Sequence, residues 1–248
     1  MCNINVIFLA ETDSTNLEAW RRIKAGTAND KTLIWTKNQK SGKGAANNSW
    51  ESEADKNLAA TYILNPDFLE VEEQFYLNKC ISLAVRDSIS LMLNRKNNVF
   101  IKWPNDIFIN DRKIAGILIE NSIMGDKITK SVIGIGINVN QKKFSKELVN
   151  AISLSKISEK EHDIEVCLKI LSEQIKKWWD ILKLKEFDFI DKTYLNHLYL
   201  YRQTAKFKSD KGVFEGKITA ISKYGQLRVV SSDNVLHEFN FKEVVYPV

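Results

Sequence analysis

The sequence predicts an α/β fold, strictly α+β, in which a larger part that mixes strands with helices precedes a small β-barrel. Short apolar runs bounded by turn residues recur over the first 140 residues, and longer segments between them carry apolar residues at helical spacing. After Tyr199 the pattern changes to short alternating strands. We therefore expect one domain over residues 1–199 and a second domain over residues 200–248.

The strands expected in the first part are short apolar runs between turn residues, the usual signature of a buried sheet. They cover residues 4–9, 33–36, 58–64, 99–101, 114–119 and 128–139. Pro66 ends the third of these strands because proline cannot donate to a strand ladder. Asn110-Asp111 predicts a turn between the fourth and the fifth, which together form a central hairpin.

Three segments predict helices. Thr15 and Glu18 have the spacing of a capping box, in which two side chains satisfy the first amides of a helix, and Gly26 predicts its end. Residues 72–94 carry apolar residues at roughly helical spacing and predict a long buried helix. Asp163 predicts the cap of an amphipathic helix. We expect its core-facing residues to be Val166, Ile170 or Leu171, Ile175, Trp178, Trp179 and Leu182. The tryptophan pair is thus interpreted as part of the core rather than as a ligand cage.

The C-terminal part has the pattern of a small barrel. Its alternating strands are expected over residues 204–208, 213–221, 226–230 and 236–241. Turn signals separate these strands at Asp210-Lys211-Gly212, Lys223-Tyr224-Gly225 and Asp233-Asn234. Several short strands in so short a segment are typical of a small closed β-unit rather than of an open sheet with helices.

Composition and charge are those of an ordinary globular protein, with 44% hydrophobic and 27% charged residues. The net charge of +5 suits an anionic ligand such as a nucleotide, whereas a nucleic-acid binder gathers its lysines on one face and here they are spread along the chain. No apolar run approaches the roughly 20 residues of a membrane span. The three cysteines lack metal or redox spacing, which predicts reduced thiols and a cytoplasmic location.

Residues 102–120 hold the most informative pattern of the chain. Lys102-Trp103-Pro104-Asn105-Asp106 places an amide and a carboxylate beside a Trp-Pro corner, and Arg112-Lys113 opens the next strand. Lys113 is therefore a fixed cation that can face a ligand. A purely structural hairpin is the alternative if this segment is taken alone.

Two further segments contain glycines that allow a ligand to approach the backbone. Residues 37–44 combine three lysines with Gly42 and Gly44, which suits phosphate binding, although the spacing is not that of a Walker A loop and a solvated loop is the alternative. Gly134-Ile135-Gly136-Ile137-Asn138 is too short for a dinucleotide fingerprint. The three histidines have no metal spacing, and Ser14 has no histidine partner in the sequence, so a hydrolase nucleophile is not expected.

Four motifs, in order over residues 13–140, resemble the signature of the biotin protein ligases. They are Asp13-Ser14-Thr15-Asn16, then Gln39 to Gly44 with Trp50, then Lys102 to Asp106 with Arg112 to Glu120, and finally Gly134 to Asn140. The resemblance implies a mixed sheet flanked by helices, like the catalytic core of class II aminoacyl-tRNA synthetases, and a C-terminal SH3-like barrel. It also implies an enzyme that uses ATP and Mg²⁺ to convert biotin to biotinyl-5′-AMP, and then transfers biotin to a lysine of a biotin carboxyl carrier domain.

The resemblance also implies roles for individual residues. Lys113 would contact both the biotin carboxylate and the α-phosphate, with Lys43 as the second catalytic residue, and Asp106 would serve Mg²⁺. The biotin pocket would be formed by Ser14, Thr15, Asn16, Gln39, Gly42, Trp50, Gly116, Gly134 and Gly136. ATP would be bound by Lys43, Lys102, Trp103, Asn105, Lys113 and Asn138, with Asn138 at the adenine.

The glycine loop departs from the family pattern. Lys43 stands where the family has an arginine, so the charge is kept but the two-pronged guanidinium is lost. Ala45 and Ala46 remove polar contacts, and one sequence does not reveal whether they are native. We expect weaker retention of the acyl-adenylate. Because about a dozen residues precede Ser14, we expect no DNA-binding domain ahead of it and no DNA partner. A homodimer through an exposed sheet edge is a further implication of the resemblance.

Three alternatives to a biotin ligase stay open. A lipoate or octanoate ligase or transferase would share the fold but would need an apolar tunnel for a straight chain. A catalytically weakened biotin-binding protein would keep the pocket without turnover. A nucleic-acid adaptor that acts through the C-terminal barrel would show salt-sensitive binding.

Overall fold

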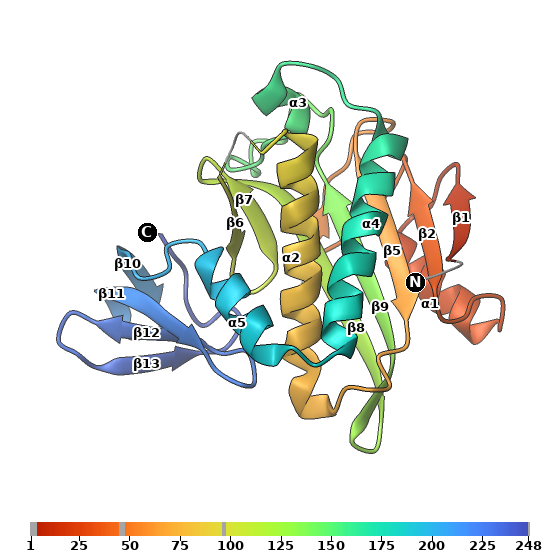
Figure 1. Ribbon diagram of the computed structural model, residues 1–248. Coiled ribbons are helices and arrows are strands. Elements are labelled where there is room, and N and C mark those ends of the chain that lie inside the picture. Colours follow the sequence, from red (N-terminus) through yellow and green to blue (C-terminus); the bar gives the residue numbers. More distant parts are fainter. Residues whose placement is uncertain (1–3, 45–47, 96–97, 248) are drawn as a thin grey trace.

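The computed structural model describes residues 4–44, 48–95 and 98–247, and its centre is a mixed sheet with helices on both faces (Figure 1). The sheet has seven strands in the order β1-β2-β5-β9-β8-β7-β6. The strands are β1 (Asn5–Leu9), β2 (Thr32–Thr36), β5 (Leu58–Leu64), β9 (Lys127–Ile137), β8 (Arg112–Met124), β7 (Asp106–Ile109) and β6 (Val99–Lys102). The β1–β2 pair is parallel and the other pairs of this sheet are antiparallel, so the predicted mixed sheet is confirmed.

The two faces of the sheet carry different helices because strand side chains alternate between faces. Leu33 and Ile133 join the large core under α2 (Gln74–Met92) and α4 (Ile164–Lys183), which lie side by side in Figure 1. Ile34 follows Leu33 on β2, and Val132 precedes Ile133 on β9. Both join the second apolar cluster, which contains Ala19 of α1 (Thr15–Lys24). Helix α1 therefore covers the opposite face, and the prediction that helices flank the sheet is confirmed.

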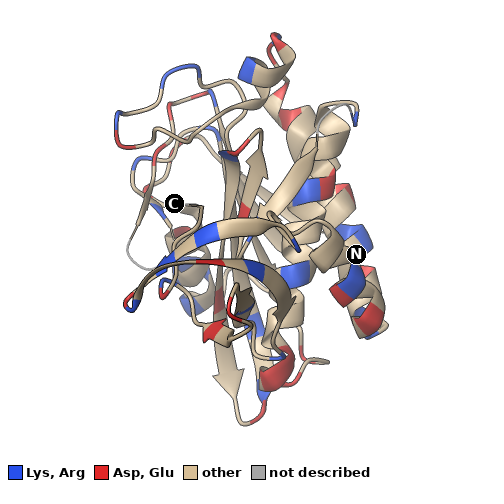
Figure 2. Ribbon diagram, turned by 90° about the vertical axis from the view of Figure 1, so that its left-hand side faces the viewer, with Lys and Arg blue, Asp and Glu red and all other residues tan. Residues whose placement is uncertain are grey.

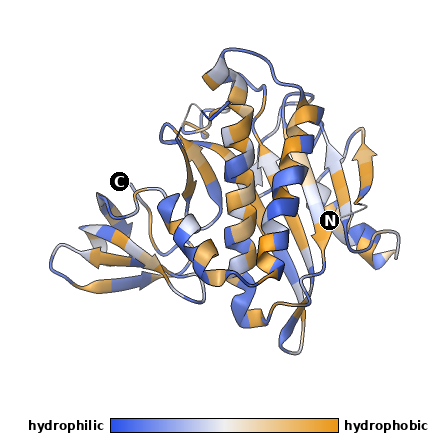
Figure 3. Cartoon of the chain, in the orientation of Figure 1, coloured by the Kyte–Doolittle hydropathy of each residue, from blue (hydrophilic) through white to orange (hydrophobic). Residues whose placement is uncertain are grey.

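The long helices follow the predicted hydrophobic pattern. A short 3₁₀ turn at Val71–Glu73 precedes α2. Helix α2 is apolar along most of its length, whereas α4 carries polar stripes between its apolar residues (Figure 3). The Asp163 carboxylate caps α4 by accepting hydrogen bonds from the backbone amides of Glu165 and Val166, as predicted. The Trp178 and Trp179 side chains are buried, which confirms their core role. Val166 was wrongly assigned to the core: 53% of it is exposed, because it lies on the outer face of the first turn.

The predicted capping box at Thr15 is wrong. Helix α1 begins at Thr15 with Ser14 at the cap position, and neither side chain caps the helix. Glu18 instead pairs with Arg22 one turn later at 2.7 Å. The Thr15 hydroxyl donates to Gln39, so this side chain belongs to the pocket described below rather than to the helix end.

Several elements were absent from the sequence prediction. Strand β7 lies between the two predicted strands of the central hairpin, so that the Trp-Pro corner and Asn110-Asp111 form two separate turns. Helices α3 (Leu154–Ser158) and α5 (Phe187–Asn196) are short. The glycine loop also forms a small hairpin from β3 (Gly42–Lys43) and β4 (Ser49–Trp50). Ala45, Ala46 and Asn47 lie outside the described residues.

The C-terminal part forms the four predicted strands as a small antiparallel sheet, β10-β11-β12-β13. Their bounds are β10 (Thr204–Ser209), β11 (Gly212–Ile221), β12 (Leu227–Ser231) and β13 (Leu236–Phe239). The chain then returns to β10, where the backbones of Val245 and Lys208 exchange two hydrogen bonds of 2.9 Å. Phe207 and Tyr246 join the large core of the first part. The division into two domains at residue 199 stays a prediction.

Cys80 and Cys167 are buried free thiols, whereas Cys2 lies outside the described residues. Burial raises the pKa of the Cys167 thiol to about 12 and that of Cys80 still further, so both are protonated at neutral pH. None of the helices in the described part of the chain is long and apolar enough to cross a membrane.

Candidate functional site

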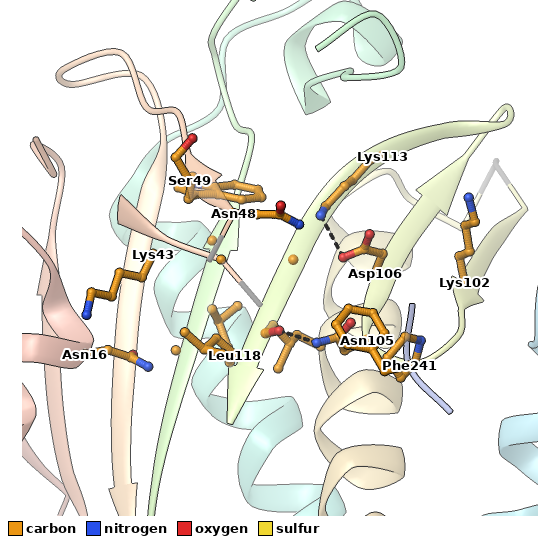
Figure 4. Close-up of a pocket in the computed structure, with 18 of the residues that line it drawn as sticks. Asn16, Lys43, Asn48, Ser49, Lys102, Asn105, Asp106, Lys113, Leu118 and Phe241 are labelled. Carbon is orange, nitrogen blue, oxygen red and sulfur yellow. Dashed lines mark hydrogen bonds and ion pairs between the residues drawn. The ribbon is translucent and has the colours of Figure 1, made fainter. Parts of the chain in front are cut away.

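A cavity of about 460 Å³ lies where the N-terminus of α1, the β3–β4 hairpin, the β6–β7 turn and strands β8 and β9 meet (Figure 4). The segment after β13 also lines it, so that the C-terminal part of the chain contributes to the cavity. Most of the residues that the sequence assigned to biotin or ATP meet here although they are up to about 120 positions apart. The described residues of this cavity that were predicted are Ser14, Thr15, Asn16, Gln39, Lys43, Trp50, Lys102, Trp103, Asn105, Asp106, Lys113, Gly116, Gly134 and Gly136.

Lys113 faces the cavity because strand β8 contains a bulge. Ile107 of β7 pairs with Ala115, whereas the next residue, Phe108, pairs with Lys113, so Ile114 is an extra residue on β8. Residues 113 and 116 would point to opposite faces of a regular strand. The bulge puts both on the cavity side, where a Cβ at Gly116 would lie 3.3 Å from Lys113 Nζ.

The Lys113 ammonium forms an ion pair with Asp106 at 2.7 Å, as Figure 4 shows. Both side chains are about one-third exposed, so water and a bound ligand can reach them. The neighbouring Asn105 side chain donates to the backbone carbonyl of Ile117 at 2.7 Å and fixes the corner against β8. Lys113, Asp106 and Asn105 therefore line the same cavity.

The floor of the cavity is bare backbone at two glycines that Trp50 covers. A Cβ at Gly136 would lie 2.4 Å from the Trp50 ring, and one at Gly116 would lie 3.1 Å from it. Lys113 Nζ is 5.7 Å from the centre of the same ring. The Trp50 indole nitrogen is buried and has no hydrogen-bond partner among the described residues. The glycines thus leave room for a flat group, which the Trp50 indole occupies in this structure.

The end of the cavity away from Asp106 is lined by amides and hydroxyls. The Gln39 side-chain oxygen accepts hydrogen bonds from the backbone amide of Thr15 at 2.8 Å and from its hydroxyl at 3.2 Å. Because that oxygen is already engaged, the Gln39 NH₂ group is the part left for a ligand. Asn16 and Ser14 lie beside it, both nearly fully buried. This end is therefore suited to a ligand that offers hydrogen-bond acceptors.

Positive charge dominates the cavity. Four lysines line it, Lys43, Lys102, Lys113 and Lys242, against one carboxylate, Asp106, among the described lining residues. Lys43 is exposed and lies on the Asn16 side, away from Lys113 and Asp106 (Figure 4). Burial lowers the pKa of Lys102, Lys113 lowers it further, and Asp106 partly opposes this. The arrangement suits an anion as long as the lysines are charged.

A magnesium ion fits this site when it arrives with a nucleotide. The described residues contain no cluster of three His, Cys, Asp or Glu side chains that could hold a metal. A single Asp106 carboxylate, already paired with a cation, is enough for an ion whose remaining ligands are phosphate oxygens and water. The donor set therefore matches Mg²⁺ bound with ATP rather than a resident metal.

Two predicted site residues do not line the cavity. The Asn138 amide donates to the backbone carbonyl of Ile152 at 3.0 Å and is buried. Its side chain is therefore not in a position to make the predicted contact with adenine in this structure. Gly42 lies behind the wall, where a Cβ would come within 2.6 Å of Gln39 Nε2 and of the Trp50 carbonyl oxygen. Its role is to let the hairpin pack closely against Gln39.

Sequence reasoning missed the part of the site that follows β13. Phe241, Lys242, Val244, Val245 and Tyr246 line the cavity from the C-terminal segment. The Trp103 indole N–H donates to the backbone carbonyl of Gly225 at 2.8 Å and anchors the second sheet there. No spacing in the sequence indicates this contact, because it joins residues that are more than 100 positions apart.

The lowered pKa of Lys102 predicts a pH effect. Lys102 should lose its charge at a lower pH than an ordinary lysine, whose pKa is about 10.4. Affinity for a phosphate-bearing ligand should therefore begin to fall below that pH, and Lys102→Met should remove this step. The effect on the free energy of unfolding has the opposite sign. Burial of the charged Lys102 costs free energy, and this cost disappears as the pH rises through the lowered pKa of Lys102. A pH series of the Kd of ATP, used as a phosphate-bearing probe, for both proteins measures the first effect, and an unchanged profile in Lys102→Met would contradict it.

About half of the chain is similar to a known protein family and to individual ligases. The family model described as the biotin/lipoate A/B protein ligase family matches residues 8–138. A biotin–[acetyl-CoA-carboxylase] ligase of Paracoccus denitrificans is 34% identical over 131 residues, 53% of each chain. A bifunctional ligase/repressor BirA of Bacillus spizizenii is 36% identical over 130 residues, 51% of this chain and 39% of the relative. The chain thus spans about half, or less, of the length of these relatives.

Solved structures resemble the whole described fold. The biotin protein ligase from Aquifex aeolicus in complex with biotin and ATP has a TM-score of 0.79 at 25% identity, over 97% of both chains. The biotin acetyl coenzyme A carboxylase synthetase from Helicobacter pylori with bound biotinylated ATP has a TM-score of 0.59 at 18% identity, over 96% of this chain and all of the other, which supports the fold alone. Since residues 8–138 make up just over half of the 248-residue chain, the chain belongs to the biotin/lipoate A/B protein ligase family.

Proposed function

We propose that this chain is a biotin protein ligase. In the first step it would join biotin to ATP, forming biotinyl-5′-AMP and releasing pyrophosphate. In the second, the amine of a lysine in a biotin carboxyl carrier domain would attack the mixed anhydride and release AMP. The observation that carries the proposal is a single cavity with amide and hydroxyl donors at one end and a lysine-rich end that contains Asp106.

Lys113 has the central place in this mechanism. Its ammonium lies at the lysine-rich end, over the bare backbone at Gly116. There it can hold the biotin carboxylate against the α-phosphate and stabilise the charge that develops on the phosphoryl oxygens. A bound Mg²⁺ would supply further neutralisation of the phosphates, and Asp106 is the residue that would hold it. In the second step Lys113 can polarise the acyl carbonyl that the acceptor amine attacks.

The donor end favours biotin over a straight-chain acid. A ureido ring offers a carbonyl acceptor to the NH₂ group of Gln39, whereas lipoate and octanoate end in apolar atoms. A buried donor left without a partner costs binding free energy, of the order of 1–3 kcal/mol for each group. We therefore place lipoate or octanoate transfer second. A weakened binding protein is third, because Lys113 and Asp106 are both in place for turnover.

Biotin-dependent ATP–pyrophosphate exchange tests the first step. We expect exchange with biotin and Mg²⁺, and none above background with lipoate or octanoate. Exchange with the straight-chain acids alone would move the protein to the lipoate branch of the family. Biotin binding without exchange for any acid would instead show a binding protein.

The finer partner assignments belong to this proposal. The acceptor would be a biotin carboxyl carrier protein, in the cytoplasm, and a homodimer could form along the free edge of β1, where Val6 and Phe8 are each about half exposed. We expect no DNA partner. Lysines and arginines are spread over most elements and mixed with acidic residues (Figure 2), unlike the single basic face of a nucleic-acid binder.

Lys43 gives a test of adenylate retention. It is exposed on the Asn16 side of the cavity and stands where the family has an arginine, so a contact with the adenylate phosphate requires its side chain to turn toward Lys113. We expect Lys43→Arg to slow the release of biotinyl-5′-AMP severalfold, because a guanidinium can form two parallel hydrogen bonds to a phosphate. The measurement is the rate at which preformed radiolabelled adenylate leaves the protein without acceptor. Equal rates for both proteins would contradict the expected role of Lys43.

A further inference from the structure

The Asn16 side chain, at the donor end of the cavity, is held by a carboxylate that does not line the cavity. Asn16 Nδ2 donates to Glu120 Oε2 at 2.9 Å, and the indole N–H of Trp20 donates to the same oxygen at 3.3 Å. On its other side, the Asn16 carbonyl oxygen accepts from the hydroxyl of Thr61 at 2.8 Å. Asn16 is 4% exposed, so water does not compete strongly for these contacts.

These contacts decide which way the Asn16 amide points. An ionised carboxylate can accept hydrogen bonds but cannot donate them, so the amide nitrogen must face Glu120. The amide oxygen then faces Thr61 and the backbone of Gly134, where a Cβ would lie 2.2 Å from it. The amide has a second N–H, which Glu120 does not use, and Asn16 lines the cavity. That N–H is the group that Asn16 can offer to a ligand.

We propose that Glu120 is a positioning residue for ligand recognition: it fixes Asn16 as a hydrogen-bond donor at the end of the cavity occupied by the ureido ring. This inference rests on the proposed function, since the ureido carbonyl is the acceptor that the donor would meet. The charge of Glu120 also polarises the amide and strengthens its remaining N–H as a donor. With Gln39, whose side-chain oxygen accepts hydrogen bonds from Thr15, two amides are then held in the donor orientation at this end of the cavity.

Removal of the Glu120 carboxylate should weaken the binding of ligands that offer a hydrogen-bond acceptor to Asn16. We expect Glu120→Leu to raise the biotin Kd about tenfold or more, the size of one hydrogen bond that involves a charged group. Glu120→Gln should retain most of the affinity, because its amide oxygen can accept from the same two donors. Trp20→Phe is the matched control: it removes the other contact of the same carboxylate, and the biotin Kd should stay within about twofold.

A second ligand separates positioning from general damage to the pocket. In 2-iminobiotin at neutral pH a protonated guanidinium-type group replaces the ring carbonyl, so it offers donors and no acceptor. The wild-type protein should prefer biotin, and Glu120→Leu should lose that preference because it weakens biotin alone. An equal loss for both ligands would overturn the inference and show a structural role. So would an unchanged biotin Kd in Glu120→Leu.

The network can also be measured without any ligand, which distinguishes the inference from the proposed function. The Asn16 side-chain NH₂ and the Trp20 indole N–H should give ¹⁵N–¹H signals that shift in ligand-free Glu120→Leu, with the Asn16 pair changing little in Trp20→Phe. Signals of Asn16 that do not move in Glu120→Leu would overturn the positioning role. A wild-type protein with this signature that binds neither ligand would overturn the proposed function and, with it, the assignment of the donor to a ureido group.

Discussion

Replacement of Lys113 by alanine is expected to lower biotin-dependent pyrophosphate exchange by about 10²- to 10³-fold, the loss typical of one electrostatic group aimed at developing charge. The Lys113 ammonium is held at the cavity by the bulge at Ile114 and by the ion pair with Asp106. Its nitrogen lies beside the bare backbone at Gly116, where a Cβ would be 3.3 Å away. The measurement is the exchange rate at saturating biotin and ATP.

Lys127→Ala is the matched control for this prediction. Lys127 is a partly exposed lysine that pairs with Glu70 at 3.3 Å at the start of β9, and it does not line the cavity. Its replacement should leave exchange unchanged, since a surface ion pair contributes about 0–1 kcal/mol to stability. Exchange by Lys113→Ala within a few-fold of wild type would contradict the mechanism proposed here.

Replacement of Trp103 by alanine should reduce the free energy of unfolding by about 3–5 kcal/mol, as for other large buried aromatic side chains. Trp103 is 6% exposed, donates to the Gly225 carbonyl and packs edge-on against Phe241. Its loss should therefore also loosen the second sheet, including the segment that lines the cavity. Denaturant unfolding gives the first quantity, and amide hydrogen exchange in β12 and β13 gives the second.

Two comparisons separate these effects. Trp103→Phe keeps most of the packing and removes one hydrogen bond, so it should cost about 1 kcal/mol beyond the loss of ring area. Trp178→Ala removes an equally buried tryptophan whose indole bonds Asp87 in the large core. Trp178→Ala should lower the free energy of unfolding by a similar amount, but it should not selectively increase amide hydrogen exchange in β12 and β13. Equal protection patterns in Trp103→Ala and Trp178→Ala would contradict the anchoring role of Trp103.

The sequence was most informative where local chemistry determines structure. The strand of residues 58–64 was predicted with its observed bounds because seven apolar or small residues between polar ones leave little alternative. The Asp163 cap was predicted from one residue type before an apolar repeat. In contrast, Thr15 has the spacing of a capping box, but its hydroxyl and amide bond Gln39. A tertiary partner outcompeted the local pattern.

The site could be predicted in part for the same reason. The motifs located the cavity, but not the bulge that turns Lys113 towards Asp106, because a bulge is defined by the partner strand. Glu120 ends the motif of residues 102–120, yet its contact with Asn16 joins positions 104 apart. The lining from Phe241 to Tyr246 depends on how the second sheet docks, which no periodicity encodes. Contacts between distant segments are thus what the sequence left open.

We propose that this cavity makes biotinyl-5′-AMP and passes biotin to a protein lysine. The most direct measurement is intact-mass analysis of a biotin carboxyl carrier domain after incubation with the chain, biotin, ATP and Mg²⁺. We expect a mass gain of one biotinyl group, confined to the acceptor lysine and absent when that lysine is arginine or when Lys113→Ala replaces the wild-type chain. A carrier that stays unmodified while the same chain catalyses exchange with lipoate or octanoate would contradict it.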